Sequence, residues 1–398
     1  MNKLFGSSQI TKVLVLTLCL TFGHIDAVNA RLMCSGIFTE ISWGTLKPDF
    51  NHTTTYTKEI PQATAIKNQC NLGTCHQYSW VANLEQNYTA NTGEILVLSN
   101  HYLSAQQILN RSLNMLTIEV NSAKISLGAA PLISRREILD YGLIPESAWT
   151  PKVEFYKEPA AKRMNEYLEN IIARTKIKMK AAESSHQKES LLLEGRKQIE
   201  EFLHSFIGEL PTQFEWHGKT YTPTQFSSAY FGFFKVPYTN MFIIRSRKES
   251  DVTTHYLDET TIQTNINVAE KKAVELIDQG HSFSLHYEHH HEYVDKATGI
   301  MSIRAFYTPD YAKPLTRKQR KDFSKDSGGH VVQVVGYERS PFTGEIVKWK
   351  VRNSWGDKNG DGGFFHMYND YFRTFAKAVT YTTENLQTIP LKMPVKGQ

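Results

Sequence analysis

The sequence lacks the features that would assign it to several large classes of protein. Its 398 residues contain no internal repeat and no low-complexity tract. After the first thirty residues, no apolar run approaches the roughly twenty residues that a membrane-spanning helix needs. The net charge is only +5, and the richest basic stretch, residues 313–325, is typical of a solvated loop. Because no concentrated basic stripe carries base-reading residues, we expect no nucleic-acid partner.

The first thirty residues predict an export signal. Basic residues precede an apolar stretch at residues 13–22, and Ala30 ends a segment of small residues that suits a cleavage site. This stretch is too short to span a bilayer. Cys19 follows Leu18, where a lipidation site would need a small residue. We therefore expect a secreted or extracytoplasmic protein, periplasmic or extracellular, without a membrane anchor.

Cysteine is scarce, with four residues in the chain, and one of them, Cys19, falls within the predicted signal. In an oxidising compartment two of Cys34, Cys70 and Cys75 should pair, leaving an odd thiol, unless that thiol bonds another chain. Cys70 and Cys75 could pair, but the position of Cys75 argues against it. It follows a glycine and begins a helical pattern, residues 74–87, and helix N-terminal N–H groups favour a thiolate. We therefore expect Cys75 to be free and Cys34 to pair with Cys70.

The order of sequence patterns predicts an α+β fold. After the signal at 1–30, residues 31–150 form a helical half that carries the odd cysteine, and 151–255 hold a helical insertion with a connecting segment. The insertion shows two apolar stripes between residues 158 and 208, typical of two antiparallel helices. Residues 256–398 form a β half, in which strand-like runs are separated by tight turns, as in an antiparallel sheet or barrel.

Three short segments carry side chains suited to nucleophilic catalysis. Cys75 is the candidate nucleophile, and His330, at the start of a very apolar stretch, is the candidate base. Asn353, on the next predicted strand, can orient the imidazole of His330 through its side-chain carbonyl. Gln69, six residues before Cys75, can donate to an oxyanion together with the Cys75 backbone N–H. Trp355 can shield the bond between Asn353 and His330 from water.

These segments resemble the papain family of cysteine peptidases. The resemblance rests on Gln69 and Gly73 ahead of Cys75, on a histidine followed by apolar residues and Gly-Tyr, and on Asn-Ser-Trp-Gly at residues 353–356. It implies a papain-like fold with the active-site cleft between the two halves, and catalysis without a cofactor. Two departures stand out: His76 replaces the usual tryptophan, and Leu72 replaces the usual structural cysteine. The second suggests a rerouted disulfide, or none.

Spacing points to one branch of this family. In papain and cathepsins the histidine follows the cysteine by about 130–150 residues, whereas here the distance is much longer because of the helical insertion. Residues 210–216 and 221–226, with Pro-x-x-Phe-x-Trp and Thr-Pro-x-x-Phe elements, resemble the bleomycin hydrolase and aminopeptidase C branch, as do residues 140–145. The C-terminal tail does not match the ending of that branch. Exopeptidase specificity is therefore not implied.

Two other segments imitate metal sites. His286 and residues 289–291 form a histidine cluster, for which we expect a solvated loop rather than a transition-metal site. Residues 357–362 imitate the start of a calcium loop, but position twelve is Tyr368, so a hairpin turn is expected. We predict no bound metal.

The leading hypothesis is hydrolysis of peptide bonds in peptides or proteins through a thioester on Cys75, with His330 as general base and acid. One alternative is a catalytically silent papain-like binding protein, although the complete set of Cys, His, Asn and Gln side chains speaks against it. The other is a thiol amidase or acyltransferase acting on non-protein substrates, which no residue excludes.

Overall fold

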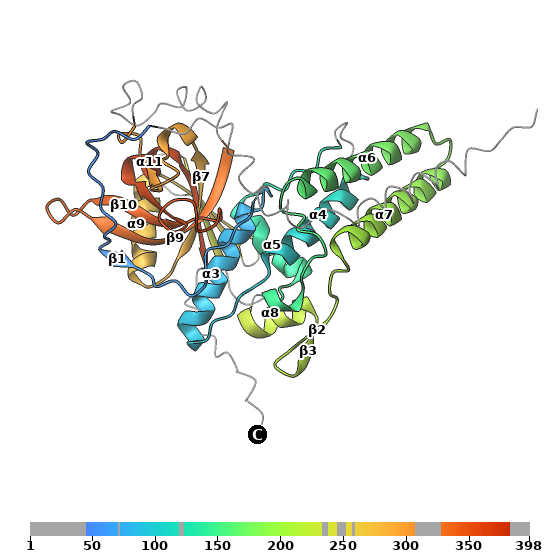
Figure 1. Ribbon diagram of the computed structural model, residues 1–398, viewed down its shortest axis with the longest axis horizontal. Coiled ribbons are helices and arrows are strands. Elements are labelled where there is room, and N and C mark those ends of the chain that lie inside the picture. The colour runs from blue at the N-terminus through green and yellow to red at the C-terminus, as the bar shows by residue number, and fades with distance from the viewer. Residues whose placement is uncertain are drawn as a thin grey trace, which may run out of the picture.

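The computed structural model describes residues 45–70, 72–118, 123–232, 238–244, 252–256, 259–306 and 328–382. The predicted signal, Cys34 and the basic stretch at 313–325 lie outside the described residues. The chain forms a sheet-rich part and a helical part, and helix α3 (Cys75–Thr92) lies where the two parts meet (Figure 1).

The helical part follows α3 along the chain. Its elements are α4 (Asn100–Met115), α5 (Pro131–Tyr141), the 3-10 turn η3 (Glu146–Ala148), α6 (Ala160–Ala181), α7 (Ser185–Ile207), the hairpin β2 (Phe214–Trp216) and β3 (Lys219–Tyr221), and α8 (Pro223–Phe231). The start of α8 is encoded locally, because Thr222 and Gln225 form a reciprocal capping box ahead of a proline. Within this described region no helix is long and apolar enough to cross a membrane, and the same holds for the rest of the described chain.

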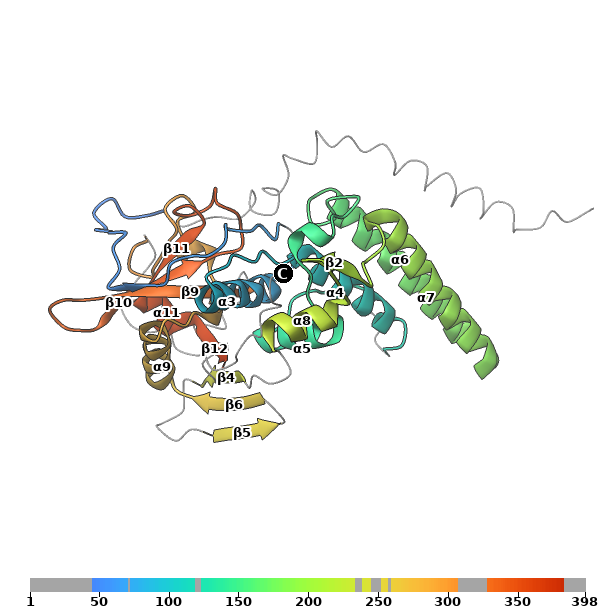
Figure 2. The ribbon, with the colours of Figure 1, turned by 90° about the horizontal axis from the view of Figure 1, so that it is seen from below.

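Helices α6 and α7 form an antiparallel hairpin that extends away from the sheet (Figures 1 and 2). Their facing stripes are buried, including Leu168 on α6 and Leu203 on α7. Ser184 caps α7 by accepting from the Gln187 backbone N–H, and Gly208 ends it with a positive φ of 93°. The two predicted helices of the insertion are confirmed, with the break between Ala181 and Ser185.

The sheet-rich part contains a ten-stranded sheet. Its strands are β1 (Lys58–Glu59), β4 (Tyr238–Ile243), β5 (Val252–Tyr256), β6 (Glu259–Thr264), β7 (Phe283–His289), β8 (Ile300–Met301), β9 (Gly328–Arg339), β10 (Ile346–Arg352), β11 (Phe364–Tyr368) and β12 (Ala376–Thr382). The strand order is β5-β6-β4-β12-β7-β9-β10-β11-β8, with β1 on β9. Helices α9 (Ile266–Asp278) and α11 (Asn369–Phe375) and the 3-10 turn η5 (His291–Tyr293) complete this part. Most pairings are antiparallel, as predicted, while β4–β6 and β8–β11 are parallel.

The sheet begins earlier in the chain than the predicted boundary at residue 256. Strand β4 pairs with β12 from Tyr238 onward, and β1, far upstream, pairs with β9. The strand-like runs predicted for residues 256–398 are confirmed as β7, β9, β10, β11 and β12. Because polar and short strands such as β1 and β4 lack strong alternation, their place in the sheet was not evident from the sequence.

Helix α3 contacts both parts of the molecule. It packs against β9 and β7 on one side and against α4, α5 and α8 on the other. The helix therefore buries apolar residues such as Val81 and Leu84 and also polar ones such as Ser79 and Asn83, which hydrogen-bond to Ser284 of β7. This placement sets the first residue of α3 beside the start of β9.

Candidate active site

Cys75 is the first residue of α3 and a free, buried thiol. Thr74, at the N-cap, makes no side-chain cap, and its hydroxyl accepts instead from Ser104. The N–H groups of the first turn are therefore not taken by a capping side chain. Backbone N–H groups of Val331 and His76 bond to the sulfur and lower its pKa. The contact with Val331 places the thiol beside the residue that follows His330.

Cys70 differs from Cys75, because it is not a free thiol. The predicted partner, Cys34, lies outside the described residues, so the pairing of Cys34 with Cys70 stays a prediction.

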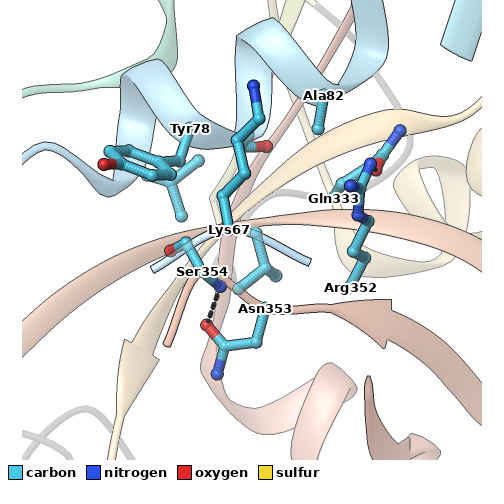
Figure 3. Close-up of a pocket in the computed structure, with 10 residues that line it drawn as sticks. Lys67, Tyr78, Ala82, Gln333, Arg352, Asn353 and Ser354 are labelled. Atoms are coloured by element: carbon cyan, nitrogen blue, oxygen red, sulfur yellow. Dashed lines mark hydrogen bonds between the residues drawn. The ribbon is translucent and has the colours of Figure 1, made fainter. Parts of the chain in front are cut away.

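His330 lies on β9 and is hydrogen-bonded to Asn353, which follows the last residue of β10. The Nε2 atom of His330 is 2.9 Å from Oδ1 of Asn353. The same Oδ1 accepts from the backbone N–H of Ser354 at 2.8 Å, the bond drawn in Figure 3. An atom that accepts from an N–H must be the amide oxygen, so the second bond identifies it and requires Nε2 of His330 to carry the proton. Nδ1 is then the basic nitrogen of the neutral ring.

Trp355 lies over His330. The two rings are stacked at 4.7 Å between centroids with an interplanar angle of 21°, and His330 and Asn353 are 5% and 4% exposed. A hydrogen bond screened from water in this way is stronger than an exposed one. Gly356, which follows Trp355, adopts a φ of 79°, and a Cβ there would meet the Asn68 side chain at 3.0 Å, so this turn requires glycine.

Burial dominates the protonation of Cys75 and His330. It raises the pKa of Cys75 to about 11 and lowers the pKa of His330 to about 4. The helix N-terminus was expected to favour a thiolate, and the backbone donors act in that direction, but burial outweighs them. The resting pair is therefore a thiol beside a neutral imidazole, and charge separation requires one proton to move from Cys75 to His330.

Gln69 is held on both sides of its amide. Its Oε1 accepts from the Ser354 hydroxyl at 2.5 Å, and its Nε2 donates to the Leu72 carbonyl at 2.6 Å. The second Nε2 hydrogen is not used by either bond. The backbone N–H of Gln69 also donates to the Ser354 carbonyl at 2.8 Å. The bonds to Ser354 thus connect Gln69 to the residue that directly follows Asn353.

A buried charge cluster that the sequence reading missed connects the segments of the site. Glu85, on α3 and 0% exposed, accepts from Lys67 at 2.6 Å and from Thr64 at 2.7 Å. Arg352, immediately before Asn353, donates to the Thr64 hydroxyl and carbonyl and to the Ala65 carbonyl. Three segments, which lead to Gln69, Cys75 and Asn353, are thereby joined. The only signal in the sequence was an acidic residue in an otherwise buried helical pattern.

The cluster borders a small pocket between α3, β9 and β10 (Figure 3). The pocket is lined by Lys67, Tyr78, Ser79, Ala82, Val331, Val332, Gln333, Arg352, Asn353 and Ser354. Figure 3 shows Lys67 and Tyr78 on the α3 side and Arg352 and Asn353 on the strand side.

His76, which replaces the usual tryptophan of the resembled family, belongs to the helical core. It is 0% exposed, its Nδ1 is 2.7 Å from the Ser134 hydroxyl, and its Nε2 is 3.1 Å from the Leu127 carbonyl. A carbonyl only accepts, so Nε2 carries the proton and the hydroxyl donates to Nδ1. Burial lowers the pKa of His76 to about 4, which keeps the ring neutral. His76 therefore anchors the start of α3 to α5.

The histidine cluster is not a solvated loop, and that prediction was wrong. His289 is 3% exposed, because β7 continues through it and its alternation directs Tyr287 and His289 to the core. His290, which follows the strand, is 1% exposed, and its backbone N–H donates to the Tyr371 hydroxyl. Among the described residues, no group of three or more His, Cys, Asp and Glu side chains is arranged to hold a metal ion. Residues 357–362 form turns ahead of β11, as expected for that segment.

Three separate segments thus bring the site residues together: the start of α3 with the residues just before it carries Cys75 and Gln69, β9 carries His330, and the residues after β10 carry Asn353 and Trp355. Free thiol, basic imidazole nitrogen and amide-oriented ring form the arrangement of a thiol acyl-transfer site.

Comparison with known proteins shows the family to which the chain belongs. Residues 135–392 match the sequence profile of the Peptidase C1-like family, and the chain therefore belongs to that family. The match includes His330 and Asn353, whereas Gln69 and Cys75 precede it.

Curated relatives and a solved structure extend the comparison. Aminopeptidase G of Lactobacillus delbrueckii subsp. lactis is 29% identical over 110 residues, 26% of this chain and 25% of that protein. Aminopeptidase C of Listeria monocytogenes serovar 1/2a is 34% identical over 74 residues, 18% of this chain and 16% of that protein. The matched regions thus span a quarter or less of these relatives. The crystal structure of PepW from Lactobacillus rhamnosis HN001 superposes with a TM-score of 0.65 at 17% identity, over 97% of this chain and 95% of that one, which shows a shared papain-like fold.

Proposed function

We propose that the protein is a cysteine peptidase that hydrolyses peptide bonds through a thioester on Cys75. The observation that carries the proposal is the tautomer of His330, since Asn353 and Ser354 together leave Nδ1 as the basic nitrogen. The family membership and the naming of relatives as aminopeptidases support the same class of reaction.

The reaction proceeds in two balanced steps. Cys75 gives its proton to His330 as the sulfur attacks the carbonyl carbon, and His330 passes that proton to the departing amine when the C–N bond breaks. Water then attacks the thioester, with His330 taking a proton from water and returning it to the sulfur. The Gln69 amide and the Cys75 backbone N–H stabilise the oxyanion in both steps.

The test combines thiol labelling with peptide cleavage. Mature protein is treated with E-64 or iodoacetamide, and Cys75→Ala and His330→Ala are compared with wild type. We expect selective modification of Cys75 in the wild type and loss of rapid labelling in both variants. A thiol that reacts no faster than free cysteine would exclude the enzyme, and the protein would then be a binding protein of the same fold.

Substrate class is tested on matched peptides with free and acetylated N-termini. Cleavage that requires a free N-terminus indicates an aminopeptidase, like the activity named for the relatives, and cleavage of both indicates an endopeptidase. Labelling without cleavage of any peptide would redirect the proposal to amidase or acyltransferase chemistry on non-protein substrates.

We also propose that the protein is exported and carries a Cys34–Cys70 disulfide. The apolar stretch before Ala30 and the odd number of remaining cysteines support this. Mass spectrometry of the non-reduced protein should find a mature chain without the first thirty residues and a peptide pair linked through Cys34 and Cys70. An intact precursor in the cytoplasm would contradict export, and a Cys70–Cys75 bond would contradict the pairing.

A further inference from the structure

A second imidazole lies against the proposed catalytic histidine. Strands β7 and β9 are paired with Tyr287 opposite His330, and His289 is two residues further on the same face of β7. Both Tyr287 and His289 are nearly inaccessible, at 1% and 3% exposed. The core face of β7 thus supplies two polar aromatic side chains to the surroundings of His330.

The ring contacts show how these side chains are arranged. His289 lies nearly perpendicular to His330, with centroids 5.9 Å apart and planes at 80°, and nearly perpendicular to Trp355 at 5.0 Å and 84°. The Tyr287 ring is 5.8 Å from His330 at 71°, and its hydroxyl is 3.0 Å from Nδ1 of His289. His330 is therefore stacked on one ring and bounded by the edges or faces of two others.

The groups around His289 determine its charge. On its own segment His289 is near His290 and His291, and across the sheet it meets His330. His286 of β7 and His291 also act on His330 and lower its pKa. The nearest carboxylates, Glu288 and Glu292, interact with His290, and Glu288 also pairs with Lys377 of β12 at 2.9 Å. Burial and the neighbouring imidazoles keep the pKa of His289 well below its usual value. His289 is therefore a neutral, polar ring at the pH of catalysis.

We propose that His289, held by the Tyr287 hydroxyl, is a positioning residue that fixes the His330 ring and stabilises its protonated form. His330 gains a positive charge when it accepts the thiol proton, in a place that water hardly reaches. Buried charge is costly unless polar groups surround it. Asn353 solvates one side of the ring, Trp355 offers its π face, and the dipole of His289 contributes from a third direction. The inference rests on the proposed function, because it assigns a role within that reaction.

The substitutions that test this role separate polarity from packing. His289→Phe keeps an aromatic ring, removes the ring nitrogens and leaves the Tyr287 hydroxyl without its partner. His289→Gln restores polarity without the ring. Tyr287→Phe removes only the hydroxyl. It provides the test if His289→Phe does not fold. His204→Gln, on the exposed face of α7, is the matched control.

The first readout is the rate of Cys75 alkylation by iodoacetamide as a function of pH. In His289→Phe we expect the acid limb of the profile, which follows protonation of His330, to move to lower pH by about half a unit or more, and the alkylation rate above it to fall. Tyr287→Phe should shift it in the same direction by less, and the double variant should shift it no further than His289→Phe. His289→Gln should return toward wild type, and His204→Gln should overlay it.

The second readout is peptide hydrolysis, where His289→Phe should lower kcat by about tenfold with KM unchanged. An acid limb that stays at the wild-type pH in both His289→Phe and Tyr287→Phe overturns the inference. Equal loss of kcat in His289→Phe and His289→Gln with unshifted limbs also overturns it, because the side chain would then only fill space. The alkylation profile needs no substrate. A protein that is alkylated normally but cleaves no peptide therefore contradicts the proposed function, while the role of His289 is still decided by the alkylation profiles of the variants.

Discussion

The Ser354 hydroxyl donates to the Gln69 side-chain oxygen at 2.5 Å, while the Gln69 backbone N–H donates to the Ser354 carbonyl at 2.8 Å. Ser354 also donates its own backbone N–H to Asn353. One residue thus fixes both the proposed oxyanion donor and the group that orients His330. The geometry of the site therefore depends on the bonds of Ser354 as well as on Cys75, His330, Asn353 and Gln69.

Ser354→Ala should therefore impair catalysis without altering the fold. The Gln69 amide loses the bond that holds its oxygen, and its donor becomes less well placed for the oxyanion. Since complete removal of an oxyanion donor costs about 100- to 1,000-fold in kcat, we expect a decrease of about tenfold with little change in KM. Steady-state kinetics measure this, with Ser340→Ala in an exposed turn as the control. A loss of kcat/KM that comes only from a higher KM would contradict the assignment of Gln69.

Asn353→Ala should have a larger effect than Ser354→Ala. Without the amide oxygen, nothing on that side requires Nε2 of His330 to carry the proton, so the basic nitrogen faces Cys75 in only part of the molecules. We expect kcat to fall by about 100-fold and the rate of Cys75 alkylation to fall with it. Alkylation that stays at the wild-type rate would show that Trp355 and the β7 side chains alone orient His330.

Glu85→Gln should destabilise the protein strongly, because it leaves Lys67 with a largely buried charge and no carboxylate. Removing one partner of a buried pair costs about 3–5 kcal/mol. Urea unfolding in the Cys75→Ala background measures the free energy of unfolding without autolysis. Glu201→Gln, which removes an exposed pair with Lys197, should change it by less than about 1 kcal/mol. Similar values for both variants would contradict a structural role for the buried cluster.

Stability should fall in acid through buried neutral histidines. Burial lowers the pKa of His76, His101 and His366 in the folded protein from 6.5 to about 4. The unfolded chain binds protons on these residues first, so unfolding takes up protons, and the free energy of unfolding decreases as pH falls from about 6.5 to 4 and levels off below.

His101→Phe isolates one of these contributions. The ring stacks on Tyr156 at 3.9 Å, so phenylalanine preserves the packing and removes the titration. The variant should lose less stability between pH 6.5 and 4, by up to about 1.4 kcal/mol per pH unit. Thermal or urea unfolding at several pH values provides the measurement, and an unchanged slope would show that His101 is accessible to protons in the folded state.

Sequence patterns predicted the elements that carry strong local signals. The helix that begins at Cys75, the α6–α7 hairpin and the apolar strands of the sheet follow from periodicity, caps and turns. The candidate residues Cys75, His330 and Asn353 were evident because each stands at the start or end of such an element. Helix α5 and the strands β1 and β4 were not evident, since their residues alternate weakly and their pairing partners lie far away in the chain.

By itself the sequence determined which chemical groups the protein has and the local elements that bear them, because thiol, imidazole and amide identities and helix or strand periodicity are properties of neighbouring residues. Only the tertiary structure decided how they are surrounded. In the folded protein, β7 continues to His289, whose ring contacts His330, and His76 is buried against α5. Lys67, Glu85 and Arg352 form one buried cluster that connects three segments. Such contacts depend on register and packing between distant segments, and burial then fixes the protonation of Cys75 and His330 in a way that no local pattern encodes.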